Sequence, residues 1–126
     1  MERQPVLDWI DRYERAWRAE GTGTLPGLFT EDATYLQSPY EAPKVGLREI
    51  AVMWDDERSG PDEQFTMSRE LVAVDGDTAV ARVLVRYGDP LRQEYLDLWV
   101  IRFASDGRVE RFEEWPYWPD RGYTPS

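Results

Sequence analysis

Residues 91–118 read LRQEYLDLWVIRFASDGRVERFEEWPYW, and this stretch decides the fold class. Two runs rich in aromatic and β-branched residues, 91–103 and 108–118, flank the short polar turn ASDG. Strand-forming runs separated by a short glycine-containing turn are typical of an antiparallel β-hairpin. The C-terminal part of the chain therefore predicts two long, paired strands.

The same pattern continues toward the N-terminus. Segment 65–74 (FTMSRELVAV) is followed by the turn DGD, and segment 78–87 (TAVARVLVRY) is followed by GDP. Short polar turns between long strands again indicate hairpins. The second half of the chain thus predicts four consecutive antiparallel strands.

The first half of the chain predicts mainly helices. Over residues 5–20, apolar side chains recur at helical spacing, namely Val6, Ile10, Tyr13 and Trp17. A short second helix is expected at 25–30, a strand at 33–39 and a third helix at 47–58. This order predicts one α+β domain spanning residues 1–126, with three N-terminal helices on one face of a curved antiparallel sheet. We expect the C-terminal residues 121–126 to be loosely held.

Composition excludes several classes of function. The 126 residues include no cysteine and no histidine, which excludes thiolate catalysis, zinc–sulfur sites and nucleophiles activated by histidine. The net charge of −10 argues against a nucleic-acid partner and against binding to an anionic membrane. No calcium-loop spacing is present, so we expect no metal ion. We also expect no cofactor. Without a signal-peptide or membrane-span pattern, we expect a cytoplasmic protein.

Strand alternation divides the C-terminal hairpin into two faces. Tyr95, Asp97 and Trp99 share one face of the first strand, and Glu114 lies opposite to Glu113 on the second. Both faces of the first strand are largely apolar. Periodicity alone therefore leaves open which of the two adjacent glutamates points inward.

Two phrases resemble a known family. The N-terminal RYERAWRAEGTGTLPGLFTEDATY (12–35) and the C-terminal DGRVERFEEW (106–115), with the loop SPYEAPKVG (38–46) between them, are similar to the SnoaL-like group of the NTF2-like superfamily. This group consists of small bacterial proteins. The resemblance implies an NTF2-like cone with a pocket at its wide end, and commonly a homodimer formed through the outer sheet face. The superfamily contains enzymes and binding domains, so the resemblance does not decide the function.

An ungapped comparison with the steroid isomerases of this superfamily assigns the faces. The resemblance implies that Asp97, Trp99, Phe112 and Glu114 point into the cone, while Glu113 is exposed or ion-paired. A β-bulge would change this assignment.

A first candidate site combines Asp97 and Glu114 with an arginine from a neighbouring strand, such as Arg69, Arg82 or Arg86. Two carboxyl groups across a guanidinium can divide acid and base roles between them. Limonene-type epoxide hydrolases of the superfamily resemble this arrangement, and Tyr35 and Gln37 stand where those enzymes hold the attacking water. The alternative is a buried ion-pair network that closes the cone.

Aromatic residues supply further candidates for ligand contact. Tyr13 resembles the tyrosine that forms the oxyanion hole of steroid isomerases, but Gln37 and Ser38 stand where those enzymes need a carboxylate base, which disfavours their mechanism. A convergent aromatic set would form an apolar slot for a ring-shaped ligand, with ordinary core packing as the alternative. Its members are Trp17, Trp54, Tyr95, Trp99 and Phe112.

These observations lead to three hypotheses. The first is a cofactor-independent acid–base enzyme of the hydrolase or hydratase type, which uses Glu114 and Asp97 on a small apolar or cyclic molecule. The second is a non-catalytic ligand-binding or accessory dimeric domain with the same pocket. The third is a purely structural dimer with a filled core.

Overall fold

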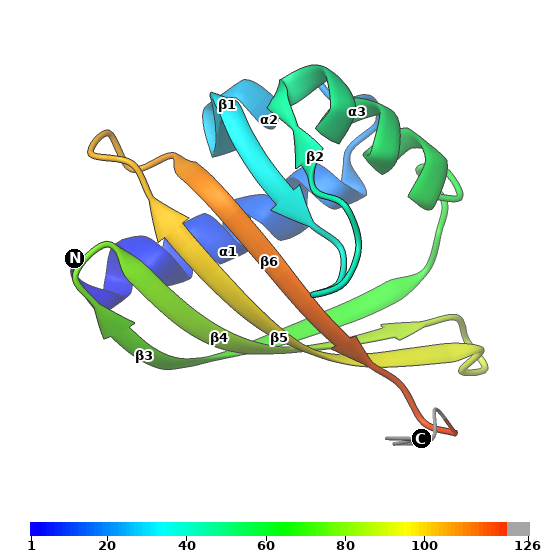
Figure 1. Ribbon diagram of the computed structural model, residues 1–126. Coiled ribbons are helices and arrows are strands. Elements are labelled where there is room, and N and C mark those ends of the chain that lie inside the picture. Colours follow the sequence, from blue (N-terminus) through cyan, green and yellow to red (C-terminus); the bar gives the residue numbers. More distant parts are fainter. Residues whose placement is uncertain (121–126) are drawn as a thin grey trace.

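The computed structural model describes residues 1–120, and the expectation for residues 121–126 lies outside them. Three helices precede or interrupt the first strands: α1 (Arg3–Arg18), α2 (Leu25–Leu28) and α3 (Gly46–Glu57). The six strands are β1 (Phe29–Leu36), β2 (Lys44–Val45), β3 (Phe65–Asp75), β4 (Thr78–Tyr87), β5 (Gln93–Phe103) and β6 (Val109–Tyr117). Figure 1 shows the strands curving around α1, with α2 and α3 above one end of the sheet.

The α+β class, the three helices and the curved sheet of the predicted cone are confirmed by this arrangement (Figure 1). The strands form one sheet in the order β2-β1-β6-β5-β4-β3. The prediction of a purely antiparallel sheet is wrong in one place, because β1 runs parallel to β6. Strands β3 to β6 form consecutive hairpins, whereas β1 reaches β6 only through the closing of the whole fold. The two-residue strand β2 lies in the segment expected to be a loop.

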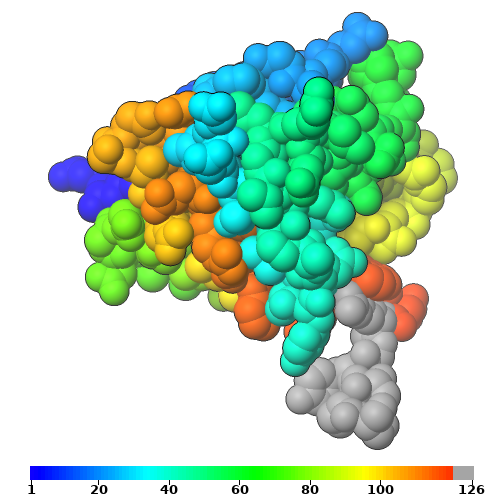
Figure 2. All heavy atoms as spheres, turned by 45° about the horizontal axis from the view of Figure 1, so that its top comes forward, coloured from blue at the N-terminus to red at the C-terminus, as the bar shows by residue number. Residues whose placement is uncertain are grey.

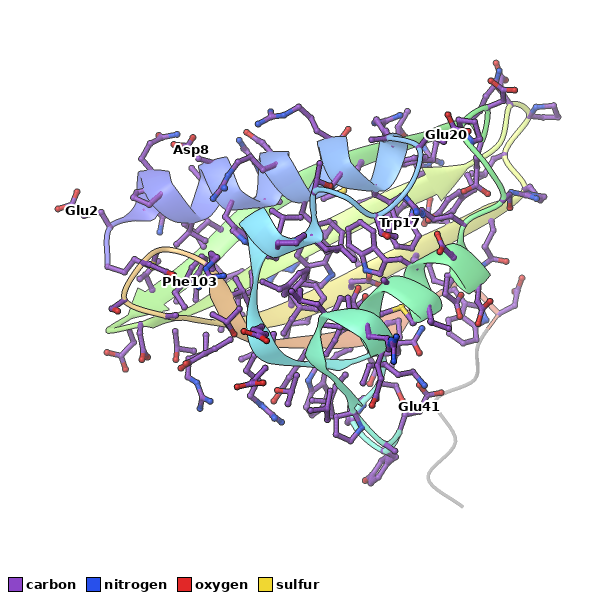
Figure 3. The ribbon with its side chains drawn as sticks, turned by 90° about the horizontal axis from the view of Figure 1, so that it is seen from above. Glu2, Asp8, Trp17, Glu20, Glu41 and Phe103 are labelled. Carbon is purple, nitrogen blue, oxygen red and sulfur yellow. The ribbon has the colours of Figure 1, made fainter. Side chains whose placement is uncertain are left out.

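Helix α1 packs on the sheet through the face that its periodicity predicts. The buried residues of α1 are Val6, Trp9, Ile10, Tyr13 and Ala16. In Figure 3, Trp17 lies on the inner side of this helix among other aromatic rings, whereas Asp8 points away from the sheet. Burying an apolar stripe of this kind supplies most of the stability of an amphipathic helix.

The core between α1 and the sheet is strongly aromatic. Trp9 is fully buried, contacts four other aromatic rings and donates a hydrogen bond from Nε1 to the carbonyl oxygen of Leu28 over 3.0 Å. A buried indole needs such a partner for its N–H group. Trp9 therefore joins α1 to the end of α2, next to β1.

Gly88 makes the tight connection between β4 and β5 possible. Its φ angle is +92°, a conformation that L-residues with side chains rarely adopt, and an added Cβ would lie 2.9 Å from the carbonyl oxygen of Pro90. The connection brings Tyr87 and Gln93 into register as a pair.

A β-bulge interrupts the β5–β6 ladder close to the turn that joins the two strands. Arg102 pairs with Arg111, but the next residue of β5, Phe103, pairs with Val109. The bulge places Glu110 on the outer surface, where it accepts a hydrogen bond from Arg102 over 2.9 Å. Strict alternation along β6 would place Glu110 on the same face as Phe112, and the bulge reverses the face for Glu110. Beyond the bulge the predicted alternation holds.

No helix in residues 1–120 is both long enough and apolar enough to cross a bilayer.

Candidate functional site

Asp97 and Glu114 face the interior of the cone from neighbouring strands. Trp99 pairs with Glu114 and Asp97 pairs with Pro116 across the β5–β6 ladder, so the two carboxyl groups are diagonal neighbours on one face. Asp97 is 6% exposed, and Glu114 is partly buried. The two side chains interact directly, and each acts on the pKa of the other.

A hydrogen bond between the two groups requires a proton on one of them. An ionised carboxylate only accepts hydrogen bonds, so two carboxylates share one only when one of them is protonated. Oδ2 of Asp97 accepts a hydrogen bond from Trp99 Nε1 over 3.3 Å. Oδ1 of Asp97 is buried and, apart from a proton carried by Glu114, has no donor among residues 1–120.

Two tyrosines extend the network into the core. The Tyr35 hydroxyl donates to Oε1 of Glu114 over 2.5 Å, and the hydroxyl groups of Tyr13 and Tyr35 are also 2.5 Å apart. A phenol carries one proton, and that of Tyr35 is directed to Glu114, so Tyr13 donates to Tyr35. The parallel pairing of Tyr35 with Phe112 brings the β1 tyrosine beside Glu114.

The environment separates the proton affinities of the two carboxyl groups. Burial, and then the charge of Asp97, raise the pKa of Glu114 from 4.5 to about 8. Burial raises the pKa of Asp97 from 3.8 to about 6, although its hydrogen bonds to Trp99 and Glu114 act in the opposite direction. Near neutral pH the pair therefore holds one proton between its two carboxyl groups.

Both carboxyl groups line an open pocket of about 490 Å³. Of the other predicted site residues, Trp17, Tyr35, Gln37 and Tyr95 also line it. The amide nitrogen of Gln37 donates to Glu57 over 3.3 Å. In Figure 2, β1, β2 and α3 (cyan to green) cover the centre of the face shown.

Four residues predicted to contact a ligand are placed elsewhere. They belong to the buried aromatic core and are absent from the pocket lining: Tyr13, Trp54, Trp99 and Phe112. Phe112, for example, is fully buried and stacks on Tyr13 with ring centroids 5.4 Å apart. These residues back the pocket wall, and direct contact with a ligand stays a prediction for them.

The arginine expected between the two carboxyl groups is not found in the part of the chain that the structure describes. Arg69 pairs with Asp11 on α1, whereas Arg82 and Arg86 pair with glutamates on the outer face of the sheet. Arg82 and Arg86 alternate with the buried Val83 and therefore point outward. The predicted Asp–Arg–carboxylate arrangement is wrong for these three arginines, and so is a network closed by them.

Glu113 has the surroundings that were expected for it. It accepts hydrogen bonds from Arg111 over 3.0 Å and from Trp115 over 3.3 Å on the outer side of the sheet. The neighbouring glutamates Glu113 and Glu114 thus have opposite environments.

Several pocket residues were not identified from the sequence. Glu57 at the end of α3, Glu63 before β3, and Tyr87 and Arg92 around the β4–β5 connection all line the pocket. Arg92 and Glu63 form an ion pair of 3.6 Å. Only the fold brings these segments together. The position of Tyr87 at the end of a predicted strand could have identified it as a pocket residue. Within residues 1–120, no group of three or more acidic side chains is placed to hold a metal ion.

The SnoaL-like domain family matches residues 10–112, which is most of the chain. The protein belongs to the SnoaL-like family. The family match includes Asp97 and ends two residues before Glu114. No curated protein is significantly similar to this SnoaL-like chain in sequence.

Solved structures with the same fold extend this result. Rv0760c from Mycobacterium tuberculosis has a TM-score of 0.72 at 10% identity, over 90% of this chain and 92% of that chain. SalBIII, an epoxide hydrolase/cyclase-like enzyme with a role in pyran ring formation in the polyether salinomycin, has a TM-score of 0.70 at 16% identity, over 93% and 92%. An LEH-like epoxide hydrolase from M. tuberculosis has a TM-score of 0.64 at 15% identity, over 90% and 83%. At these identities the likeness establishes the SnoaL-like fold alone.

Proposed function

We propose that this SnoaL-like protein is a cofactor-independent acid–base enzyme that adds water to a small molecule. The observation that carries this proposal is the adjacent pair of Asp97 and Glu114 on the wall of an open pocket. One group holds a proton near neutral pH and the other is ionised. A general acid and a general base are therefore available together.

Opening of an epoxide illustrates the reaction. Asp97 takes a proton from a water molecule whose oxygen attacks a ring carbon. As the carbon–oxygen bond breaks, Glu114 gives its proton to the ring oxygen, and the product is a diol. Asp97 then carries the proton taken from the water molecule, and Glu114 is ionised. Because the two groups are neighbours, the proton on Asp97 passes to Glu114 and restores the starting state.

Tyr35 and Gln37 assist this chemistry in different ways. The Tyr35 hydroxyl donates its hydrogen bond to Glu114 and so orients that carboxyl group. Tyr35 therefore has no second hydrogen to donate to the attacking water. Gln37 lines the pocket, and its amide carbonyl can accept a hydrogen bond from water or substrate. Tyr35 and Gln37 were both expected to hold the attacking water, and in this proposal only Gln37 keeps that role.

Pocket size and lining support a small, ring-sized substrate. A volume of about 490 Å³ falls in the usual range of small-molecule sites. Trp17, Tyr87 and Tyr95 offer aromatic surface for the apolar part of the substrate. The likeness to epoxide hydrolase and cyclase-like proteins favours epoxides as the first compounds to test.

The test compares Glu114→Gln and Asp97→Asn with Glu113→Gln in an assay of diol formation from a panel of cyclic epoxides. Each of the first two changes is expected to lower kcat by about 10²-fold or more, with affinity for the substrate changed little. Glu113→Gln alters the neighbouring glutamate, which lies outside the pocket, and is expected to retain full activity. Equal activity of all three variants would contradict the proposal.

A non-catalytic binding or accessory domain is the other outcome of this experiment. It is indicated if the panel binds in the pocket, if Glu114→Gln alters binding, and if no compound is turned over.

We also propose that the protein forms a homodimer through the outer face of its sheet. Leu96, Leu98, Trp115 and Tyr117 are exposed there, and they form the cross-strand pairs Leu96–Tyr117 and Leu98–Trp115. An exposed apolar patch of adjacent residues is typical of a protein–protein contact. A second copy would cover this patch and leave the pocket, on the inner face, open.

A further inference from the structure

Acidic side chains outnumber basic side chains around the pocket. Four carboxyl side chains line it, namely Glu57, Glu63, Asp97 and Glu114, whereas Arg92 is the only cationic side chain among the described lining residues. Arg92 is already engaged by Glu63 in the ion pair of 3.6 Å. Glu57 is in contact with the uncharged amide of Gln37. After these pairings, Glu57 and the Asp97–Glu114 pair each retain one negative charge.

A second observation points toward a ligand that donates hydrogen bonds. Oδ1 of Asp97 is buried on the pocket wall, and no donor group among residues 1–120 forms a hydrogen bond with it. A carboxylate oxygen can accept two hydrogen bonds. A buried acceptor of this kind favours a ligand N–H or O–H group.

The aromatic lining of the pocket also favours a cationic ligand. Trp17, Tyr35, Tyr87, Tyr95 and Trp118 all contribute to the pocket. Aromatic faces attract cations, and an organic ammonium group gains about 0.5–2 kcal/mol from such contacts. Carboxylates and aromatic rings together are a combination that binds protonated amines.

From these contacts, and resting on the pocket of the proposed function, we infer that the pocket selects small molecules that carry a basic nitrogen on an apolar or aromatic body. Carboxylates and phosphates are disfavoured, because they would approach two uncompensated negative charges. The substrate class is then an amine-bearing small molecule, with the nitrogen outside the bond that reacts.

The raised pKa of Tyr87 agrees with a negative field in the pocket. Burial is the largest cause, and the charge of Glu63 adds to it. Ionising this phenol would place another negative charge beside those of the carboxylates.

Equilibrium binding of three probes tests the inference. 2-Phenylethylamine, 2-phenylethanol and phenylacetate share a ring and a short chain but differ in charge. Calorimetry, or the fluorescence of the pocket tryptophans, is expected to give an affinity about tenfold higher for the ammonium than for the alcohol, with phenylacetate weakest.

Two charge-matched variants distinguish the pocket from the overall acidity of the chain. Glu57→Gln is expected to lower the affinity for the ammonium about threefold and to leave that for the alcohol unchanged. Glu49→Gln removes the same charge from the same helix, but Glu49 does not line this pocket, and it is expected to change neither affinity. The preference for the ammonium should also persist at high salt.

Three results would overturn the inference: no binding of the ammonium probe, an equal or higher affinity for the alcohol or the carboxylate, or equal effects of Glu57→Gln and Glu49→Gln. The proposed reaction is judged separately, because these measurements need no turnover. Loss of epoxide turnover in Glu114→Gln together with no preference for the ammonium would leave the proposed function standing and remove this inference. A preference for the ammonium without turnover of any epoxide would support this inference and remove the proposed function.

Discussion

Asp97 and Glu114 are neighbours diagonally across the β5–β6 ladder, and no arginine is paired to either within residues 1–120. The pair resembles the carboxyl pairs of enzymes in which one group donates and the other accepts a proton. In place of a guanidinium, the donors around it are the Tyr35 phenol and the Trp99 indole. These neutral donors lower the two pKa values less than burial raises them, whereas a cation would favour loss of the proton more strongly.

The stability of the protein should fall as the pH rises toward 8. The pKa of Glu114 is about 8 in the folded protein and 4.5 ordinarily, so the folded state binds this proton more tightly than the unfolded state. Its contribution is fully present below about pH 4.5 and is lost as the pH rises through about 8. Urea unfolding of wild type and Glu114→Gln at several pH values measures this contribution. The variant should lack a decline on the order of a few kcal/mol, and parallel curves would contradict the prediction.

Asp97→Asn should lower the pKa of Glu114 but leave it above 4.5. The substitution removes the charge of Asp97, which is the second cause of the raised pKa, whereas the first cause, burial, remains. Infrared detection of the protonated carboxyl band during a pH titration measures the change. Glu113→Gln is the control, because Glu113 lies on the other face. An unchanged midpoint in Asp97→Asn would show that the two groups are not coupled.

Tyr13→Phe and Tyr35→Phe should have effects on stability that are not additive. Tyr35→Phe removes the donor to Glu114 and leaves the Tyr13 hydroxyl without its acceptor, with an expected cost of about 1–3 kcal/mol. Once Tyr35 is phenylalanine, removal of the Tyr13 hydroxyl should cost little. A double-mutant cycle of unfolding free energies should therefore give a coupling of at least about 0.5 kcal/mol. Strict additivity would argue against the hydrogen-bonded chain.

Arg58→Ala should destabilise the fold by about 2 kcal/mol. The Arg58 side chain is 10% exposed and donates hydrogen bonds to the carbonyl oxygens of Ala19 and Gly21, over 2.9 and 3.0 Å, beyond the end of α1. Hydrogen bonds that involve a charged group contribute about 1.5–3 kcal/mol. Arg82→Ala, which breaks an exposed ion pair, is the control and should cost less than about 1 kcal/mol. Similar losses in both variants would be inconsistent with this role of Arg58.

Leu98→Glu should prevent the proposed homodimer. Leu98 is exposed beside Trp115 on the outer face of the sheet, and a charge there would be desolvated on association. Light scattering should give twice the chain mass of 14.8 kDa for the wild type and the chain mass for the variant. Val72→Glu introduces a charge at an exposed position on β3, outside the patch, and should leave the dimer intact. A monomeric wild type would remove the proposal.

The periodicity of the sequence predicted most elements within a few residues of their observed ends, and β4 at its observed ends, 78–87. The largest differences are at β1, which was expected at 33–39 and is found at Phe29–Leu36, and at the short strand β2. Residues 29–32 carry little strand signal of their own. Phe29 is extended because it pairs with Val109, which is 80 positions further along the chain. Local propensity contains no information about such a partner.

The amino-acid sequence by itself determined the α+β class, the hairpins and the opposite environments of Glu113 and Glu114. These features follow from spacing along one strand, where the alternation of side chains is a property of the extended backbone. Only the tertiary structure decided that Tyr35 reaches Glu114, that Asp97 shares its proton, and that the nearby arginines point elsewhere. Those contacts join segments far apart in the chain, and their distances depend on how the whole sheet closes around α1.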